Sequence, residues 1–149
     1  MMVQRMKCYT IGYGNRQVNE FIDMLIENKV TYLVDIRRYP QSTFKDYDKE
    51  SLESILPKNG ILYSHFEGVG GMRDSTYVEY METDSFKNSF EKLMDLIRKV
   101  NEEHGRVILM CAEKSPKSCH RQYLSIKLEE NDVEVIHLVE RGQTSLFKF

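Results

Sequence analysis

The sequence predicts an α/β fold: a mostly parallel sheet of about five strands with helices on both faces, in a Rossmann-like three-layer arrangement. Two observations lead to this prediction. Segments with strand patterns alternate along the chain with segments whose apolar residues recur at helical spacing. One strand segment, residues 107–110, is continuously apolar, which is typical of strands buried on both faces. We expect a single α/β domain over residues 1–149, because this length suits one hydrophobic core.

The expected strands are short and rich in aliphatic, β-branched and aromatic residues, which favour a pleated and buried surface. The second strand runs into Pro40, which favours an extended turn. The five strands are expected at residues 7–12, 31–36, 61–66, 107–111 and 133–139. The tail after residue 140 has no clear pattern.

Helices are expected between these strands. The longest is closed near His104 and Gly105, and Asn59 with Gly60 gives a second helix a plausible stop. Ser115 followed by proline reads as an N-cap and first helical position, so the last helix should start there. A flexible glycine loop is expected at residues 68–73. The helical patterns cover residues 18–26, 52–56, 77–81, 86–100 and 115–131.

The composition excludes several classes of protein. Hydrophobic residues make up 41% and charged residues 30%, which is the profile of a globular protein rather than a disordered one. No apolar run has the length of a membrane span, and no signal-peptide cleavage motif is present, so we expect a cytoplasmic protein. The net charge of −2 argues against a broadly basic nucleic-acid surface. The three cysteines, Cys8, Cys111 and Cys119, are too few for a disulfide framework.

Polar residues gather where the expected strands end. Because the carboxyl ends of parallel strands lie at one edge of a sheet, these residues should converge there, where α/β proteins bind ligands. The residues concerned are Thr10, Gly12, Tyr13, Asn15 and Arg16 after the first strand, Asp35, Arg37, Arg38 and Ser42 after the second, His65 after the third, Cys111 and Glu113 after the fourth, and His137 in the fifth.

An anion site is the first interpretation of this edge. Arg121 and the helix start before it would bind an anion together, and Arg37 or Arg38 would add a bidentate clamp for phosphate or carboxylate. The structural alternative is that Arg121 pairs with Asp35 or Glu113 and only ties elements together. The expected anion-binding residues are Arg37, Arg121, Gly12 and Ser42.

Catalysis on a phosphate-bearing substrate or nucleotide is the leading hypothesis for function. His120 would be the general acid/base, because imidazole titrates near neutral pH. Asp35 or Glu113 would orient His120, and Cys119 would be an auxiliary thiol near a helix start. The ten positions from Cys111 to Arg121 are too many for a phosphatase or rhodanese loop.

Two other hypotheses stay open. The same edge would serve a non-catalytic module that binds a nucleotide or a nucleic-acid end, so the expected partners are a small anionic ligand or a nucleic-acid end, without a membrane. A zinc site is the weaker hypothesis, because the chain lacks CxxC and HxxxH spacings. Its ligands would come from Cys111, Cys119, His120, His65, Glu113 and His137. No cofactor is assigned, since Gln17 leaves the GxGxxG pattern incomplete.

Four segments together resemble the domain-of-unknown-function 488 family. They are residues 10–15, 34–42, 70–71 and 110–121, and the resemblance extends from Thr10 to His137. It implies a short α/β domain with no settled biochemical activity. Tyr13 stands where family members often have histidine, so any chemistry by that histidine would need another group here. The matching motif positions are Gly12, Asp35, Arg37, Pro40, Ser42, Cys111, Glu113, Cys119, His120 and Arg121.

Overall fold

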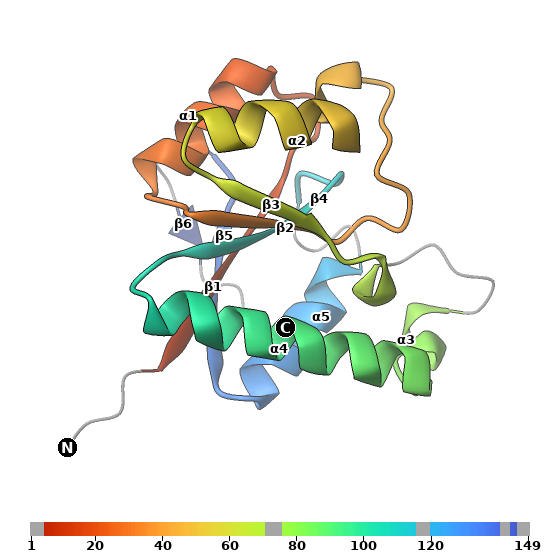
Figure 1. The fold of residues 1–149 in the computed structure, drawn as a ribbon. Helices are drawn as coiled ribbons and strands as arrows, with labels where there is room; N and C mark the ends of the chain where they lie inside the picture. Colours follow the sequence, from red (N-terminus) through yellow and green to blue (C-terminus); the bar gives the residue numbers. More distant parts are fainter. Residues whose placement is uncertain (1–4, 71–75, 116–119, 141–143, 146–149) are drawn as a thin grey trace.

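The computed structural model describes residues 5–70, 76–115, 120–140 and 144–145 of the chain (Figure 1). The strands are β1 (Met6–Gly12), β2 (Tyr32–Asp35), β3 (Leu62–His65), β4 (Val107–Cys111), β5 (Val133–Leu138) and β6 (Thr144–Ser145). The α-helices are α1 (Val18–Glu27), α2 (Lys49–Lys58), α3 (Tyr77–Tyr80), α4 (Asp84–Glu102) and α5 (Arg121–Glu130). Two single-turn 3-10 helices are η1 (Lys45–Tyr47) and η2 (Glu67–Val69).

The strands form one sheet in the order β3-β2-β4-β1-β5-β6. Strands β1 to β5 are all parallel, which confirms the predicted mostly parallel sheet of about five strands. The short β6 pairs antiparallel with the end of β5. This edge strand lies in the tail, where the sequence has no recognisable strand pattern.

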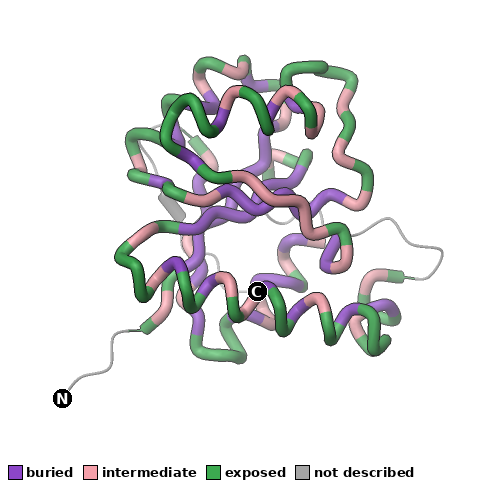
Figure 2. Tube along the Cα trace, in the orientation of Figure 1, coloured by how far each residue is buried: buried purple, intermediate pink, exposed green. Residues whose placement is uncertain are grey.

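The sheet is the middle of three layers, as predicted. Helices α1 and α2 cover one face, and α4 and α5 cover the other (Figure 1). All five residues of β4 are buried, because this central strand contacts both helical layers (Figure 2). Alternation along the strands divides the core: Ile11 and Leu33 pack with α1 and α2, whereas Cys8 and Val34 pack with α4 and α5.

The predicted helix ends are confirmed at two places. Asn59 is the C-cap of α2, and Gly60 follows with a φ of +75°, which a glycine adopts without strain. Helix α4 ends just before His104, whose φ is +62°, and the amide of Gly105 donates to the carbonyl of Val100 at 2.9 Å. This 6→1 bond closes the last turn in the manner of a Schellman motif.

The predicted start of the last helix is wrong. The helix begins at Arg121, with His120 as its N-cap residue, and not at the Ser115–proline pair; residues 116–119 lie outside the described residues. In the first part of the glycine loop expected at residues 68–73, residues 68 and 69 belong to η2, and Gly70 donates its amide to the carbonyl of Glu67 at 2.9 Å; residues 71–73 lie outside the described residues. Within the described parts of the chain, no helix is both long and apolar enough to cross a membrane.

Candidate functional site

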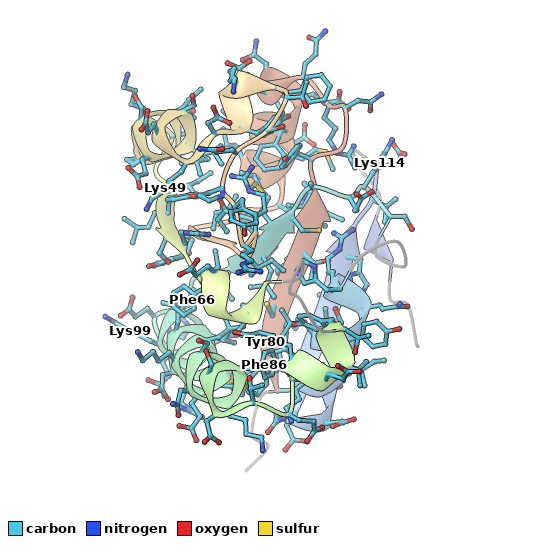
Figure 3. All side chains as sticks on the ribbon, turned by 90° about the vertical axis from the view of Figure 1, so that its right-hand side faces the viewer. Lys49, Phe66, Tyr80, Phe86, Lys99 and Lys114 are labelled. Atoms are coloured by element: carbon cyan, nitrogen blue, oxygen red, sulfur yellow. The ribbon has the colours of Figure 1, made fainter. Side chains whose placement is uncertain are left out.

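The topology of the sheet singles out the carboxyl end of β4. The chain leaves the neighbouring strands β1 and β2 toward the face that α1 and α2 cover, whereas it leaves β4 toward α5 on the opposite face. Connections that diverge in this way leave the carboxyl ends of the strands open to a ligand. Figure 3 views the molecule from the side on which β2, β3 and β4 end, and it labels Lys114 in the loop that follows β4.

The buried guanidinium of Arg121 organises this loop. Arg121 is the first residue of α5, and its side chain is fully buried. Its Nη2 donates to the carbonyl oxygens of Glu113 at 2.9 Å and of Lys114 at 3.0 Å. Its Nη1 donates to Oγ1 of Thr10 at 3.4 Å. One side chain therefore joins the start of α5, the loop after β4 and the central strand β1.

A buried histidine extends this network into β5. Thr10 and His137 are register partners on adjacent strands, and Oγ1 of Thr10 lies 2.5 Å from Nδ1 of His137. Burial and the positive charge of Arg121 lower the pKa of His137 from 6.5 to about 4. His137 is therefore neutral at pH 7, and the charge of Arg121 acts on groups beyond its own hydrogen bonds.

Gly12 is required by close packing against the loop after β4. A Cβ atom at Gly12 would lie 1.6 Å from the carbonyl oxygen of Glu113, which is far inside van der Waals contact. The amides of Tyr13 and Gly14 donate to the carbonyls of Cys111 at 3.1 Å and of residue 112 at 2.8 Å, so the two strand exits stay paired. Gly12, the last residue of β1, thus serves packing within the protein.

Asp35 and Arg37 form a second cluster, on the face that α1 and α2 cover. Arg37 donates to Asp35 through Nε at 2.8 Å and Nη2 at 2.6 Å, and both side chains are buried. Tyr63 also donates its hydroxyl to Asp35 at 2.6 Å. Burial opposes the charge of Arg37, but the hydrogen bond and the charge of Asp35 outweigh burial and raise the pKa of Arg37. The structure therefore pairs Asp35 with Arg37, and not with Arg121.

The other predicted residues lie around these two clusters. His120 is half-buried just before α5, and its ring centroid is 5.1 Å from that of Tyr77. The side chain of Glu113 is exposed, while Ser42 lies in the β2–η1 loop, where its amide donates to Asp48 at 2.7 Å. Cys119 lies outside the described residues. The structure thus brings Gly12, Glu113 and Arg121 together and separates them from Asp35 and Arg37.

The predicted zinc ligands are dispersed among other partners. Nε2 of His65 contacts the carbonyl oxygen of Arg37, His137 bonds Thr10, and Sγ of Cys111 donates to the carbonyl of Glu113 at 3.6 Å. Among the residues that the structure describes, no group of three or more His, Cys, Asp or Glu side chains could hold a metal ion.

Two residues of this region were not among the predicted site residues. Thr10 was expected among the polar residues at the end of the first strand, but the sequence assigned it no role, because its contacts with Arg121 and His137 are long-range. Lys114 pairs with Glu140 at 2.8 Å and thereby lowers the pKa of that carboxyl group. No sequence pattern links these two charges, because they meet only through the order of the strands in the sheet, in which β1 lies between β4 and β5.

Replacing Gly12 by alanine should destabilise the fold strongly. The new methyl group would displace the loop that Arg121 holds, at a cost of about 3 kcal/mol. Gly60→Ala is the control for crowding, since no atom lies within 4 Å of the added Cβ and only its φ of +75° is unfavourable for alanine; it should cost about 1 kcal/mol. Urea denaturation measures both. Equal costs would contradict the close packing described for Gly12.

The stability of the fold should depend on pH through His137. Its folded-state pKa of about 4 lies below the value of 6.5 for the free side chain, so the folded state resists protonation. The resulting stabilisation is present above pH 6.5 and is lost as the pH falls from 6.5 toward 4. Between pH 7 and pH 5 the parent should lose about 2 kcal/mol more unfolding free energy than His137→Gln. A parallel loss in both proteins would refute this role.

Comparison with known protein families gives one match. The model of the family described as a domain of unknown function, DUF488, matches residues 17–128, which include β2, β3, β4 and all five α-helices except the last two residues of α5. No curated protein and no solved structure was found to match the chain. Because the family match covers most of the chain, the protein belongs to the DUF488 family.

Proposed function

We propose that the protein binds a phosphate-bearing ligand at the loop after β4 and acts on it as an enzyme. The observation that carries this proposal is the pair of hydrogen bonds from Arg121 to two successive carbonyl groups, those of Glu113 and Lys114. The divergent connections around β4 support the location, since such places bind ligands in α/β folds.

These two hydrogen bonds also fix the direction in which the amides of Lys114 and Ser115 point. In a trans peptide the N–H points opposite to the C=O, and the described residues contain no cis peptide bond. Both carbonyls point at the same nitrogen of Arg121, so the amides of Lys114 and Ser115 both point away from it. Successive amides that point the same way form an anion-binding concavity.

Positive charge near the loop also favours an anion. In the hydrogen bonds described above, Arg121 donates to three neutral oxygens, and burial together with the charge of Arg121 lowers the pKa of His137. The ammonium group of Lys114 is partly exposed, and its ion pair with Glu140 is weak because both groups face water. Arg37 is already paired with the carboxylate of Asp35. We therefore place the anion at the Arg121 loop.

His120 is the residue that we propose as general acid/base. It directly precedes Arg121 and is half-buried beside the ring of Tyr77, so its position is coupled to the loop. The exposed carboxylate of Glu113 would orient it, and Asp35 would act only by positioning Arg37. The auxiliary role of Cys119 stays a prediction.

Two broader proposals accompany this function. We propose a cytoplasmic location, because Cys8 and Cys111 are thiols and thiols persist in reducing compartments. We also propose one α/β domain for residues 1–149, since a single sheet connects the elements from Met6 to Ser145.

Phosphate and nucleoside monophosphates should stabilise the protein. At ten times its Kd, a ligand that binds only the folded state should raise the melting temperature by about 3–6 °C. Arg121→Ala should lose this response, and Lys114→Ala should weaken it because one nearby positive charge is removed. Lys58→Ala removes the same charge at the opposite edge, at the end of α2, and should respond as the parent does.

The loss of a buried arginine can unfold the chain, so Arg121→Ala counts only if its circular dichroism spectrum and urea transition are intact. Lys114→Ala keeps the test decisive, since Lys114 is partly exposed. If no phosphate compound raises the melting temperature of the parent, or if Lys114→Ala and Lys58→Ala respond equally, the proposed site is wrong.

Turnover should depend on His120. Removing a general acid/base slows reactions by roughly 10²–10⁴-fold, so His120→Ala should lose hydrolysis of phosphate esters while keeping the thermal shift with phosphate. His104→Asn is the control, because His104 lies at the opposite edge and asparagine tolerates its positive φ. Release of inorganic phosphate is measured. Binding without turnover by the parent would instead identify a non-catalytic binding module.

A further inference from the structure

The β2–η1 loop, residues 36–44, presents two aromatic side chains to solvent. Tyr39 is 58% exposed and Phe44 is 50% exposed. Tyr123 on α5 is the other large aromatic residue that the described parts of the chain leave exposed, so two of these three lie on one loop. Figure 2 shows this connection as exposed or intermediate along most of its course, whereas Tyr47, in the η1 turn that follows, is buried.

Hydrogen bonds hold this loop in a defined shape, so the two rings are not exposed because of disorder. The amide of Ser42 donates to Asp48 at 2.7 Å, and Oγ of Ser42 accepts from the amide of Phe44 at 3.1 Å. The amide of Lys49 donates to the carbonyl of Pro40 at 2.9 Å. These bonds fix the backbone on both sides of each exposed ring, which lowers the entropic cost of binding a ligand there.

The loop leaves the sheet at the same edge as the proposed phosphate site. Strand β2 pairs directly with β4, so the β2–η1 loop and the loop that Arg121 holds start from adjacent strand ends. The guanidinium carbon of Arg38 lies 5.2 Å from the ring centroid of Tyr39. An aromatic ring with an arginine beside it, on a loop that starts from the strand end adjacent to the proposed phosphate site, suits a base that stacks while its phosphate is bound.

We propose that Tyr39 and Phe44 stack the bases of a single-stranded nucleic-acid end whose terminal phosphate binds at the loop after β4. The inference rests on the proposed function, since the phosphate site is the same. Two rings on one loop favour a strand over a mononucleotide, because each ring offers a surface to one base. Stacking tolerates any base, so little sequence preference is expected.

Fluorescence anisotropy with a 5′-phosphorylated, labelled oligothymidine at constant salt tests this inference. Tyr39→Ala and Phe44→Ala should each weaken binding about fivefold or more, which corresponds to the loss of one stacked base. Tyr39→Phe retains the ring and should bind within about twofold of the parent. Ile26→Ala is the control, since Ile26 is 48% exposed near the end of α1 at the opposite edge, and it should leave binding unchanged.

A second pair of probes separates this inference from the proposed function. A 5′-phosphorylated abasic strand should bind the parent weakly and should not distinguish Tyr39→Ala from the parent. If phosphate stabilises the protein but the ring variants bind the oligonucleotide as the parent does, the inference fails and the phosphate site stands. Thymidine monophosphate binding as tightly as the strand would overturn the strand assignment. If neither phosphate nor oligonucleotide binds, both proposals fail.

Discussion

The hydrogen bonds of the buried Arg121 guanidinium constrain the loop after β4 at the carboxyl edge of the sheet. They connect the start of α5, the loop after β4 and Thr10 of β1, which are far apart in the sequence. A buried cation is tolerated only where polar groups replace water, so the loop carbonyls have little freedom to turn elsewhere. Gly12 completes this constraint, because any larger residue would push the carbonyl of Glu113 out of place.

The two buried arginines of this edge have different electrostatic roles. Arg37 forms a two-point ion pair with Asp35, so the pair has no net charge. Arg121 donates to the neutral oxygens of Thr10, Glu113 and Lys114, and its charge adds to burial in lowering the pKa of His137. The sheet keeps the pair on one face and Arg121 on the other, since Asp35 and Thr10 point to opposite sides. We propose the phosphate beside Arg121 because Arg37 is already paired with Asp35, whereas Arg121 orients the loop after β4.

The fold could be predicted from the sequence because burial dictates its pattern. The strand β4 can be recognised from its apolar run, and the helix α4 from the spacing of Phe86, Phe90 and Leu93. Both patterns lie within a short stretch of sequence and require no knowledge of tertiary contacts. The partners of the arginines could not be predicted, because Asp35 would suit Arg37 and Arg121 equally until strand alternation is known. The start of α5 was predicted too early. The Ser115–proline pair is a helix-capping signal in the local sequence, but the helix begins only at Arg121. The β6 strand depends on its pairing with β5 and has no signal of its own.

A phosphate titration of the 15N-labelled protein, followed by the amide resonances, tests the central claim most directly. The account predicts that the amides of Lys114 and Ser115 shift most and saturate together, because Arg121 directs both toward the anion. The amide of Lys58, at the opposite edge, should stay unchanged. Saturable shifts confined to other amides, or no shift at Lys114 and Ser115, would contradict the claim that Arg121 prepares this loop for an anion.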